Sequence, residues 1–160
     1  MAITGVSTCL WFDDQAQEAA GFYVSLFPDS RIISTSYYPT DAQKPAGSVL
    51  TVDFEIFGRT FLALNGGPHF THSPAVSFQV FCDTQDEVDR LWSAIVDGGG
   101  SESMCGWCAD RFGVSWQIIP RRLTELLSSS EPDVSRRATE SMMTMNKIDI
   151  ATLEAAVAAD

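Results

Sequence analysis

The chain has 160 residues, about one domain, and its 45% hydrophobic content is enough to bury a core. Its formal net charge of −11 argues against binding to nucleic acid or to an anionic membrane, because both require clustered Lys and Arg. Residues 1–120 hold most of the excess, with 14 acidic and 5 basic side chains. This charge fits either solubility or a pocket for a cationic ligand. No apolar run reaches the roughly 18 residues of a membrane span and no signal-peptide pattern is present, so a cytoplasmic protein is expected.

The first half of the chain predicts a strand, a helix and three further strands. An apolar run at 6–12 predicts the first strand, and Asp13-Asp14 are expected to cap a helix that ends at Phe27. Residues 31–38 have strand composition. Alternating segments at 49–57 and 60–65, joined by Gly58-Arg59, predict a hairpin.

The second half repeats this order. Residues 76–82 predict a strand, 85–96 a helix capped by Asp83-Thr84, and 103–108 and 114–120 two more strands. Beyond Pro120 the pattern changes to three short helices at 124–129, 133–145 and 149–158. Methionines cluster in the middle one, which is typical of core or subunit packing.

A shift of 69 residues superimposes the two halves. It places Phe12 on Phe81, Asp14 on Asp83, Glu18 on Glu87, Phe22 on Leu91 and Tyr23 on Trp92. We therefore predict an α+β protein in which two tandem βαβββ modules, about 1–67 and 74–120, form curved mixed sheets around a cleft. Residues 121–160 are expected to form a C-terminal helical extension on this domain or on a dimer partner.

Three segments carry a family resemblance: CLWFDDQAQEAAGFYVSLFPDSRI, FLALNGGPHF and CGWCADRFGVSWQIIP. Together with the paired modules they resemble the vicinal oxygen chelate superfamily of glyoxalases, bleomycin-resistance proteins and extradiol dioxygenases. Within it they resemble the PhnB-like branch, known as the 3-demethylubiquinone-9 3-methyltransferase domain, over about residues 3–120. Methyl transfer is not expected, because no Gly-rich strand-to-helix loop could hold S-adenosylmethionine.

The resemblance also implies where a metal would bind. Carried over to this sequence, the ligand positions fall on Thr8, Ala63 (or Leu62 with a one-residue slip), Ser77 and Gln117. Only Gln117 could ligate, whereas divalent metals need about three or four donors. No metal or other cofactor is therefore expected.

Two short motifs offer a different metal site. Cys105 and Cys108 have C-x-x-C spacing, and His69 and His72 have H-x-x-H spacing, which together could suggest zinc or a redox dithiol. Residues three apart on a strand point to opposite faces, so the two thiols would need a bulge or turn to converge. Reduced, structural cysteines are the favoured interpretation, and zinc stays an alternative.

Alternation along the strands predicts which side chains line the cleft. The expected ligand-binding residues are Thr8, Phe12, Asn65, His69, Ser77, Gln79, Cys105, Trp107 and Gln117. Most are hydroxyl, amide or aromatic groups, which suit a ligand recognised by hydrogen bonds and stacking. Asp53, Glu55 and Asp110 could add acid–base chemistry only if they turned inward.

Three functions follow from these expectations. The first is metal-independent binding of a small cationic or aromatic molecule by a homodimer, as on the bleomycin-resistance side of the superfamily. The alternative is a lyase, isomerase or dioxygenase that recruits a metal, and the second alternative is a dimer scaffold without cleft chemistry. Whether the modules pair within one chain or between subunits stays open.

Overall fold

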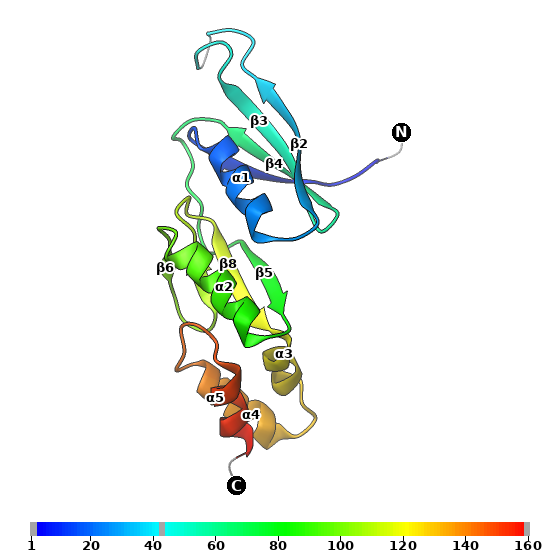
Figure 1. Ribbon diagram of the computed structural model, residues 1–160, viewed down its shortest axis with the longest axis vertical. Helices are drawn as coiled ribbons and strands as arrows, with labels where there is room; N and C mark the ends of the chain where they lie inside the picture. Colours follow the sequence, from blue (N-terminus) through cyan, green and yellow to red (C-terminus); the bar gives the residue numbers. More distant parts are fainter. Residues whose placement is uncertain (1–2, 42–43, 159–160) are drawn as a thin grey trace. The chain divides into compact units, whose positions relative to one another are not determined.

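The structure is a computed structural model that describes residues 3–41 and 44–158 (Figure 1). The chain divides into two compact units, residues 1–71 and 72–160, which we call unit 1 and unit 2. No helix in the described part of the chain is long and apolar enough to cross a membrane.

Unit 1 has the predicted βαβββ order. Its elements are β1 (Thr8–Phe12), α1 (Ala16–Leu26), β2 (Ser30–Tyr37), β3 (Val49–Ile56) and β4 (Arg59–Asn65). The four strands form one mixed sheet in the order β1-β4-β3-β2, in which β1 runs parallel to β4 and the other pairs are antiparallel. The parallel pair arises because α1 and the β2–β3 hairpin separate β1 from β4 in sequence.

The core of unit 1 lies between α1 and one face of this sheet. Ala16, Ala19 and Ala20 are fully buried, and their small side chains let the helix approach the strands closely. Tyr23 packs on Phe54 with ring centroids 6.0 Å apart. The period-two pattern of β3 buries Val52 and Phe54 on this face, as alternation predicts.

The start of α1 differs from the prediction. Asp13-Asp14 do not cap it: the N-cap residue is Gln15, and its side chain makes no capping hydrogen bond. Instead, the Ala16 N–H donates to Asn65 Oδ1 at 2.8 Å, while Asp13 pairs with Lys44. A side chain from β4 thus satisfies one of the free N–H groups of the first turn.

Unit 2 repeats the order of unit 1. Its elements are β5 (Ser77–Cys82), α2 (Gln85–Val96), β6 (Ser101–Glu102), β7 (Trp107–Ala109) and β8 (Ser115–Pro120), in the sheet order β5-β8-β7-β6. A capping box starts α2, since the side chains of Thr84 and Glu87 each accept from the other's backbone N–H. Val88, Leu91, Trp92 and Ile95 of α2 are buried, and the helix contacts β5, β7 and β8.

The predicted strand at 103–108 is interrupted. Residues 103–106 form a turn between β6 and β7, in which Cys105 and Gly106 have positive φ of 60° and 83°. The Cys105 and Gly106 N–H groups donate to the carbonyls of Met145 and Asn146, both at 2.7 Å. The N–H groups of this turn therefore bond to the C-terminal segment, while the Gly106 carbonyl accepts from the Ile118 N–H of β8 at 2.8 Å.

Three helices follow β8: α3 (Arg121–Leu127), α4 (Pro132–Met142) and α5 (Ile150–Ala158). They pack with Ile119 of β8 around an apolar cluster whose other buried members are Leu123, Leu126, Ala138, Ile148 and Leu153. Met142 and Met145 are partly buried against this cluster, so these methionines serve packing. The α+β class with two four-stranded mixed sheets and C-terminal helices is confirmed.

Candidate functional site

Each sheet has one face covered by the helix of its own unit, α1 or α2. In unit 2 we call the opposite face the open face; its residues are Ser77, Gln79, Phe81, Trp107, Ser115 and Gln117, of which Ser115 is buried. Strand register fixes this set, because Ser77 pairs with Ser115, Gln79 with Gln117, and Trp107 with Gln117. The intervening residues Phe78, Trp116 and Ile118 point to the α2 side.

A chain of hydrogen bonds crosses the open face. Gln79 Nε2 donates to Gln117 Oε1 at 3.1 Å, and Gln117 Nε2 donates to Ser77 Oγ at 2.8 Å. Ser77 and Gln117 are half-buried, whereas Gln79 is exposed. The structure therefore brings three of the predicted site residues together. The Ser77 hydroxyl proton, Gln79 Oε1 and the second Nε2–H of each glutamine are left to bond a ligand.

Aromatic side chains lie on both sides of this polar chain. Trp107 is half-buried in β7 next to Gln117, and Phe81 is 47% exposed in β5. The Arg121 guanidinium lies 5.5 Å from the centre of the Phe81 ring and pairs with Asp83 at 3.0 Å. The open face thus offers flat apolar surfaces beside amide and hydroxyl groups, an arrangement suited to a flat polar ligand.

In unit 1 the expected orientation is wrong for Phe12 and Asn65. Both lie on the α1 side, with exposures of only 3% and 4%. Asn65 caps α1 through Oδ1 and donates from Nδ2 to the Val49 carbonyl at 3.0 Å, so both ends of its amide bond to the backbone. Thr8 shares their side of β1 but is exposed at the start of the strand. Because every residue from Cys9 to Phe12 is apolar, alternation alone could not say which side faces the helix.

The side chains on the other face of unit 1 were mostly missed. They are Cys9 and Trp11 of β1, Leu62 and Leu64 of β4, and Thr51, Asp53 and Glu55 of β3. The one-residue slip from Ala63 to Leu62 was the signal that could have found this face. Here the carboxylates are already engaged: Asp53 accepts from Ser34 Oγ at 2.6 Å and Glu55 pairs with Arg31 at 3.1 Å.

The two histidines of the H-x-x-H motif fall in different units. His69 is an exposed residue of unit 1, and His72 belongs to unit 2. Cys108 lies buried in β7, where desolvation, with a further contribution from the Asp110 charge, raises the pKa of its thiol to about 12. A thiol with this pKa is protonated at neutral pH and is a poor nucleophile. Among the described residues, no group of three or more His, Cys, Asp and Glu side chains could hold a metal ion.

The buried carboxylate of Asp110 organises the turn before β8. Its Oδ1 accepts from the N–H groups of Phe112 and Val114 at 2.8 and 3.1 Å, and its Oδ2 accepts from Trp116 Nε1 at 2.8 Å. These bonds shape the turn that leads into β8 and hold Trp116 in the core. Its lone pairs are therefore committed to the fold.

This architecture of paired βαβββ units defines a protein of the glyoxalase type. Within that class, the chain belongs to the 3-demethylubiquinone-9 3-methyltransferase family, which residues 4–119 match. The structure of the PhnB protein from Bacillus cereus is 32% identical, with a TM-score of 0.66, and the match covers 73% of this chain and 99% of that one. Protein PA1353 from Pseudomonas aeruginosa is 20% identical, with a TM-score of 0.58, and the match covers 74% of this chain and 98% of that one. This similarity shows a shared fold. A search of functionally curated proteins gave no match.

The matched region and the helical extension meet at β8. The family match ends at residue 119, so α3, α4 and α5 lie beyond it. The extension buries Ile119 to 9% exposure and so covers one end of the sheet side that carries Gln117. The polar chain at Ser77, Gln79 and Gln117 lies outside the covered end.

Proposed function

We propose that this protein binds a small flat molecule, neutral or cationic, on the open face of unit 2 without using a metal. The observation that carries the proposal is the hydrogen-bonded chain of Gln79, Gln117 and Ser77. Two adjacent amides present both donors and acceptors, which complement a carboxamide or a similar edge on a ligand. Trp107 and Phe81 supply surfaces on which the ring of such a ligand stacks.

The chemistry of these groups favours binding over catalysis. Amide and hydroxyl side chains do not titrate near neutral pH, so they cannot exchange protons with a substrate as an imidazole or a poised carboxylate does. They are also weak metal ligands, and the open face carries no carboxylate, imidazole or thiolate to complete a set of donors. Methyl transfer lacks support, since the connections from β1 to α1 and from β5 to α2 contain no glycine.

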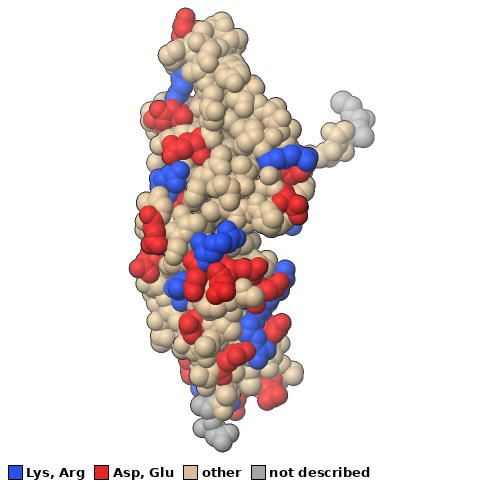
Figure 2. Space-filling view, viewed as in Figure 1, with Lys and Arg blue, Asp and Glu red and all other residues tan. Residues whose placement is uncertain are grey.

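The charge of the protein bears on the choice of ligand. A net charge of −11 raises the local concentration of cations and repels anions. Figure 2 shows Asp and Glu side chains on the visible surface with Lys and Arg among them. Many of the basic side chains already form ion pairs, as Arg122 does with Glu125 and Glu154. They therefore do not neutralise the remaining acidic side chains. A positively charged ring is favoured over an anionic one.

We extend the proposal to a cytoplasmic homodimer. Exposed apolar side chains on the edge strand β2 support a partner: Ile32, Ile33 and Tyr37 are 41%, 48% and 57% exposed. Edge strands with apolar side chains are usually paired or covered. Light scattering coupled to size exclusion should give twice the monomer mass, and a monomer at micromolar concentration would contradict this part of the proposal.

The binding proposal is tested with 1-methylnicotinamide, a flat cationic ring that bears a carboxamide. Protein treated with EDTA and shown by mass spectrometry to be metal-free should bind it saturably in a calorimetric titration. 1-Methylnicotinate, which keeps the methylpyridinium ring and replaces only the carboxamide by a carboxylate, is the matched control and should bind at least about tenfold more weakly. Equal binding of both, or binding only after a divalent metal is restored, would overturn the proposal.

A further inference from the structure

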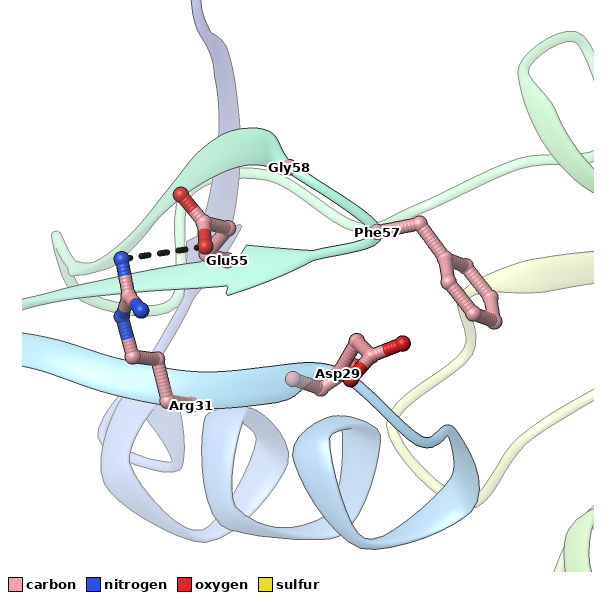
Figure 3. A pocket seen from close by; sticks show the side chains of 6 residues that line it. Asp29, Arg31, Glu55, Phe57 and Gly58 are labelled. Carbon is pink, nitrogen blue, oxygen red and sulfur yellow. Dashed lines mark ion pairs between the residues drawn. The ribbon is translucent and has the colours of Figure 1, made fainter.

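Unit 1 contains a pocket that none of the expected ligand-binding residues lines. It has a volume of about 480 Å³ and is lined by Asp29, Ser30, Arg31, Glu55, Phe57 and Gly58. These residues come from the connection that leads into β2, the start of β2, the end of β3 and the loop between β3 and β4. Figure 3 shows Arg31 and Glu55 joined on neighbouring strands, with Asp29 and Phe57 farther toward the hairpin. The volume falls in the range of small-molecule sites, roughly 300–1,000 Å³.

Of the two carboxylates that line the pocket, one forms an ion pair and the other, that of Asp29, forms none with any described residue. Arg31 Nη2 lies 3.1 Å from Glu55 Oε1, and the Glu55 side chain is only 20% exposed, so these two charges cancel each other. Among the described residues, no ion pair or side-chain hydrogen bond involves the carboxylate of Asp29. Its backbone carbonyl accepts from the Phe57 N–H at 3.3 Å, which ties it to the hairpin. The pocket therefore presents a net negative charge beside an aromatic residue.

Phe57 occupies a position that its side chain does not favour. The loop between β3 and β4 has two residues, Phe57 and Gly58, and their φ angles are 48° and 75°. Positive φ at both positions is the pattern of turns that prefer Asn or Asp followed by Gly. A phenylalanine there gains nothing from backbone preference. Its ring packs at 5.8 Å from Phe27 yet stays 57% exposed, so much of the ring surface is open.

We propose that this pocket is a binding site for a small organic cation, such as a quaternary ammonium. The exposed Phe57 ring would receive the cation by a cation–π contact, and the Asp29 carboxylate would neutralise its charge. A metal ion does not suit the site, because a single free carboxylate beside an apolar ring lacks the oxygen donors that hard cations require. This site is independent of the open face of unit 2, and neither proposal depends on the other.

Choline is the probe, and the backbone amides of Phe57 and Gly58 are the reporters. In NMR spectra of the full chain, titration with millimolar choline should shift these amides saturably and leave the side-chain amide signals of Gln79 and Gln117 in place. Glucose at the same concentrations is the neutral control. Absence of saturable shifts at residues 57 and 58 would overturn the proposal. Shifts confined to Gln79 and Gln117 would overturn it too, since they would show that choline binds on the open face of unit 2 instead.

The variant Phe57→Asn separates binding from folding. Asn suits the turn, so the hairpin should be kept and the melting temperature should not fall, whereas choline affinity should drop at least about fivefold. Phe57→Trp should bind choline more tightly than the wild type, because Trp is the strongest cation–π partner. Unchanged affinity in both variants would contradict the role of the ring.

The variant Asp29→Asn tests the carboxylate, with Asp14→Asn as its charge-matched control. Asp14 is also exposed in unit 1 but lies outside the pocket. Asp29→Asn should weaken choline binding severalfold, while Asp14→Asn should not. Equal weakening by both would show a general effect of net charge and would refute a built site. Displacement of choline by equimolar magnesium would likewise refute a site for organic cations.

Discussion

Gln117 donates from Nε2 to Ser77 Oγ over 2.8 Å, although the two residues are 40 positions apart in the sequence. The contact exists because β5 and β8 are parallel neighbours whose register sets Ser77 opposite Ser115 and Gln79 opposite Gln117. Since the side chains of one face lie at every second residue, the three polar groups meet in a single row. This row is the basis of the proposed ligand site.

Gln117→Leu removes the middle of the row while keeping the size of the side chain. We expect the affinity for 1-methylnicotinamide to fall about tenfold, or by about 1.4 kcal/mol, because the ligand loses its amide partner and its two neighbours lose their alignment. Since Gln117 is half-buried, stability should change little. Gln17→Leu, an exposed site on α1, is the matched control and should bind normally. Calorimetry and thermal denaturation of both variants measure these effects.

Asp110→Ala should be the more damaging change for the fold. It leaves the Phe112 and Val114 N–H groups and the Trp116 indole N–H without their acceptor, in a place where Asp110 itself is 4% exposed. Loss of a buried, charge-assisted network of this kind costs about 3 kcal/mol of unfolding free energy. Urea denaturation measures the loss. A cost below about 1 kcal/mol would show that the carboxylate does not organise the turn.

The four cysteines should differ in reactivity. Burial raises the pKa of Cys82 to about 11 and that of Cys108 to about 12, so both are protonated at pH 8 and shielded from reagents. Cys9 is exposed and should be alkylated first by iodoacetamide in the native protein. Peptide mass spectrometry after timed labelling gives the order. Rapid labelling of Cys108 before unfolding would mean that its thiol is ionised, and would revive a redox or metal role for the C-x-x-C motif.

The capping box of α2 should make the free energy of unfolding depend on pH in a defined direction. Hydrogen bonds from the Asp83 and Thr84 N–H groups lower the pKa of Glu87 below its ordinary value of 4.5. The ionised form therefore stabilises the native state: its contribution is complete above pH 4.5 and is lost as the pH falls through the lowered pKa. Glu87→Gln does not titrate. The difference in unfolding free energy between wild type and variant should shrink on going from pH 7 to pH 3, and a difference that stays constant would contradict the assignment.

The sequence predicted the faces of β5 and β8 more accurately than those of β1, for a physical reason. In β5 and β8 polar and apolar residues alternate, so the pattern alone assigns Ser77, Gln79 and Gln117 to one face. In β1 the run from Cys9 to Phe12 is apolar throughout, and both faces of the strand fit the pattern equally well. The face was decided by the burial of Leu10 and Phe12 on the side of the sheet that α1 covers, a tertiary effect that alternation does not encode.

Other features depended on contacts between distant segments. Asn65 was expected to bind a ligand, but it caps α1, a partnership across 49 residues. The turn at Cys105 forms because Met145 and Asn146 accept its N–H groups, and nothing in the local sequence pointed to that pairing. The pocket at Phe57 was hidden for a similar reason. The sequence predicted a turn at Gly58-Arg59, whereas the loop is Phe57-Gly58, and only the fold places Asp29 beside it.

The central claim is that Ser77, Gln79 and Gln117 bind a ligand without a metal, and side-chain NMR tests it most directly. The Nε2–H signals of Gln79 and Gln117 and the indole N–H of Trp107 are observed while 1-methylnicotinamide is added to EDTA-treated protein. We predict that all three signals shift together along one saturation curve and that added zinc or manganese changes nothing. Signals that stay fixed, or that move only when the metal is supplied, would contradict the account.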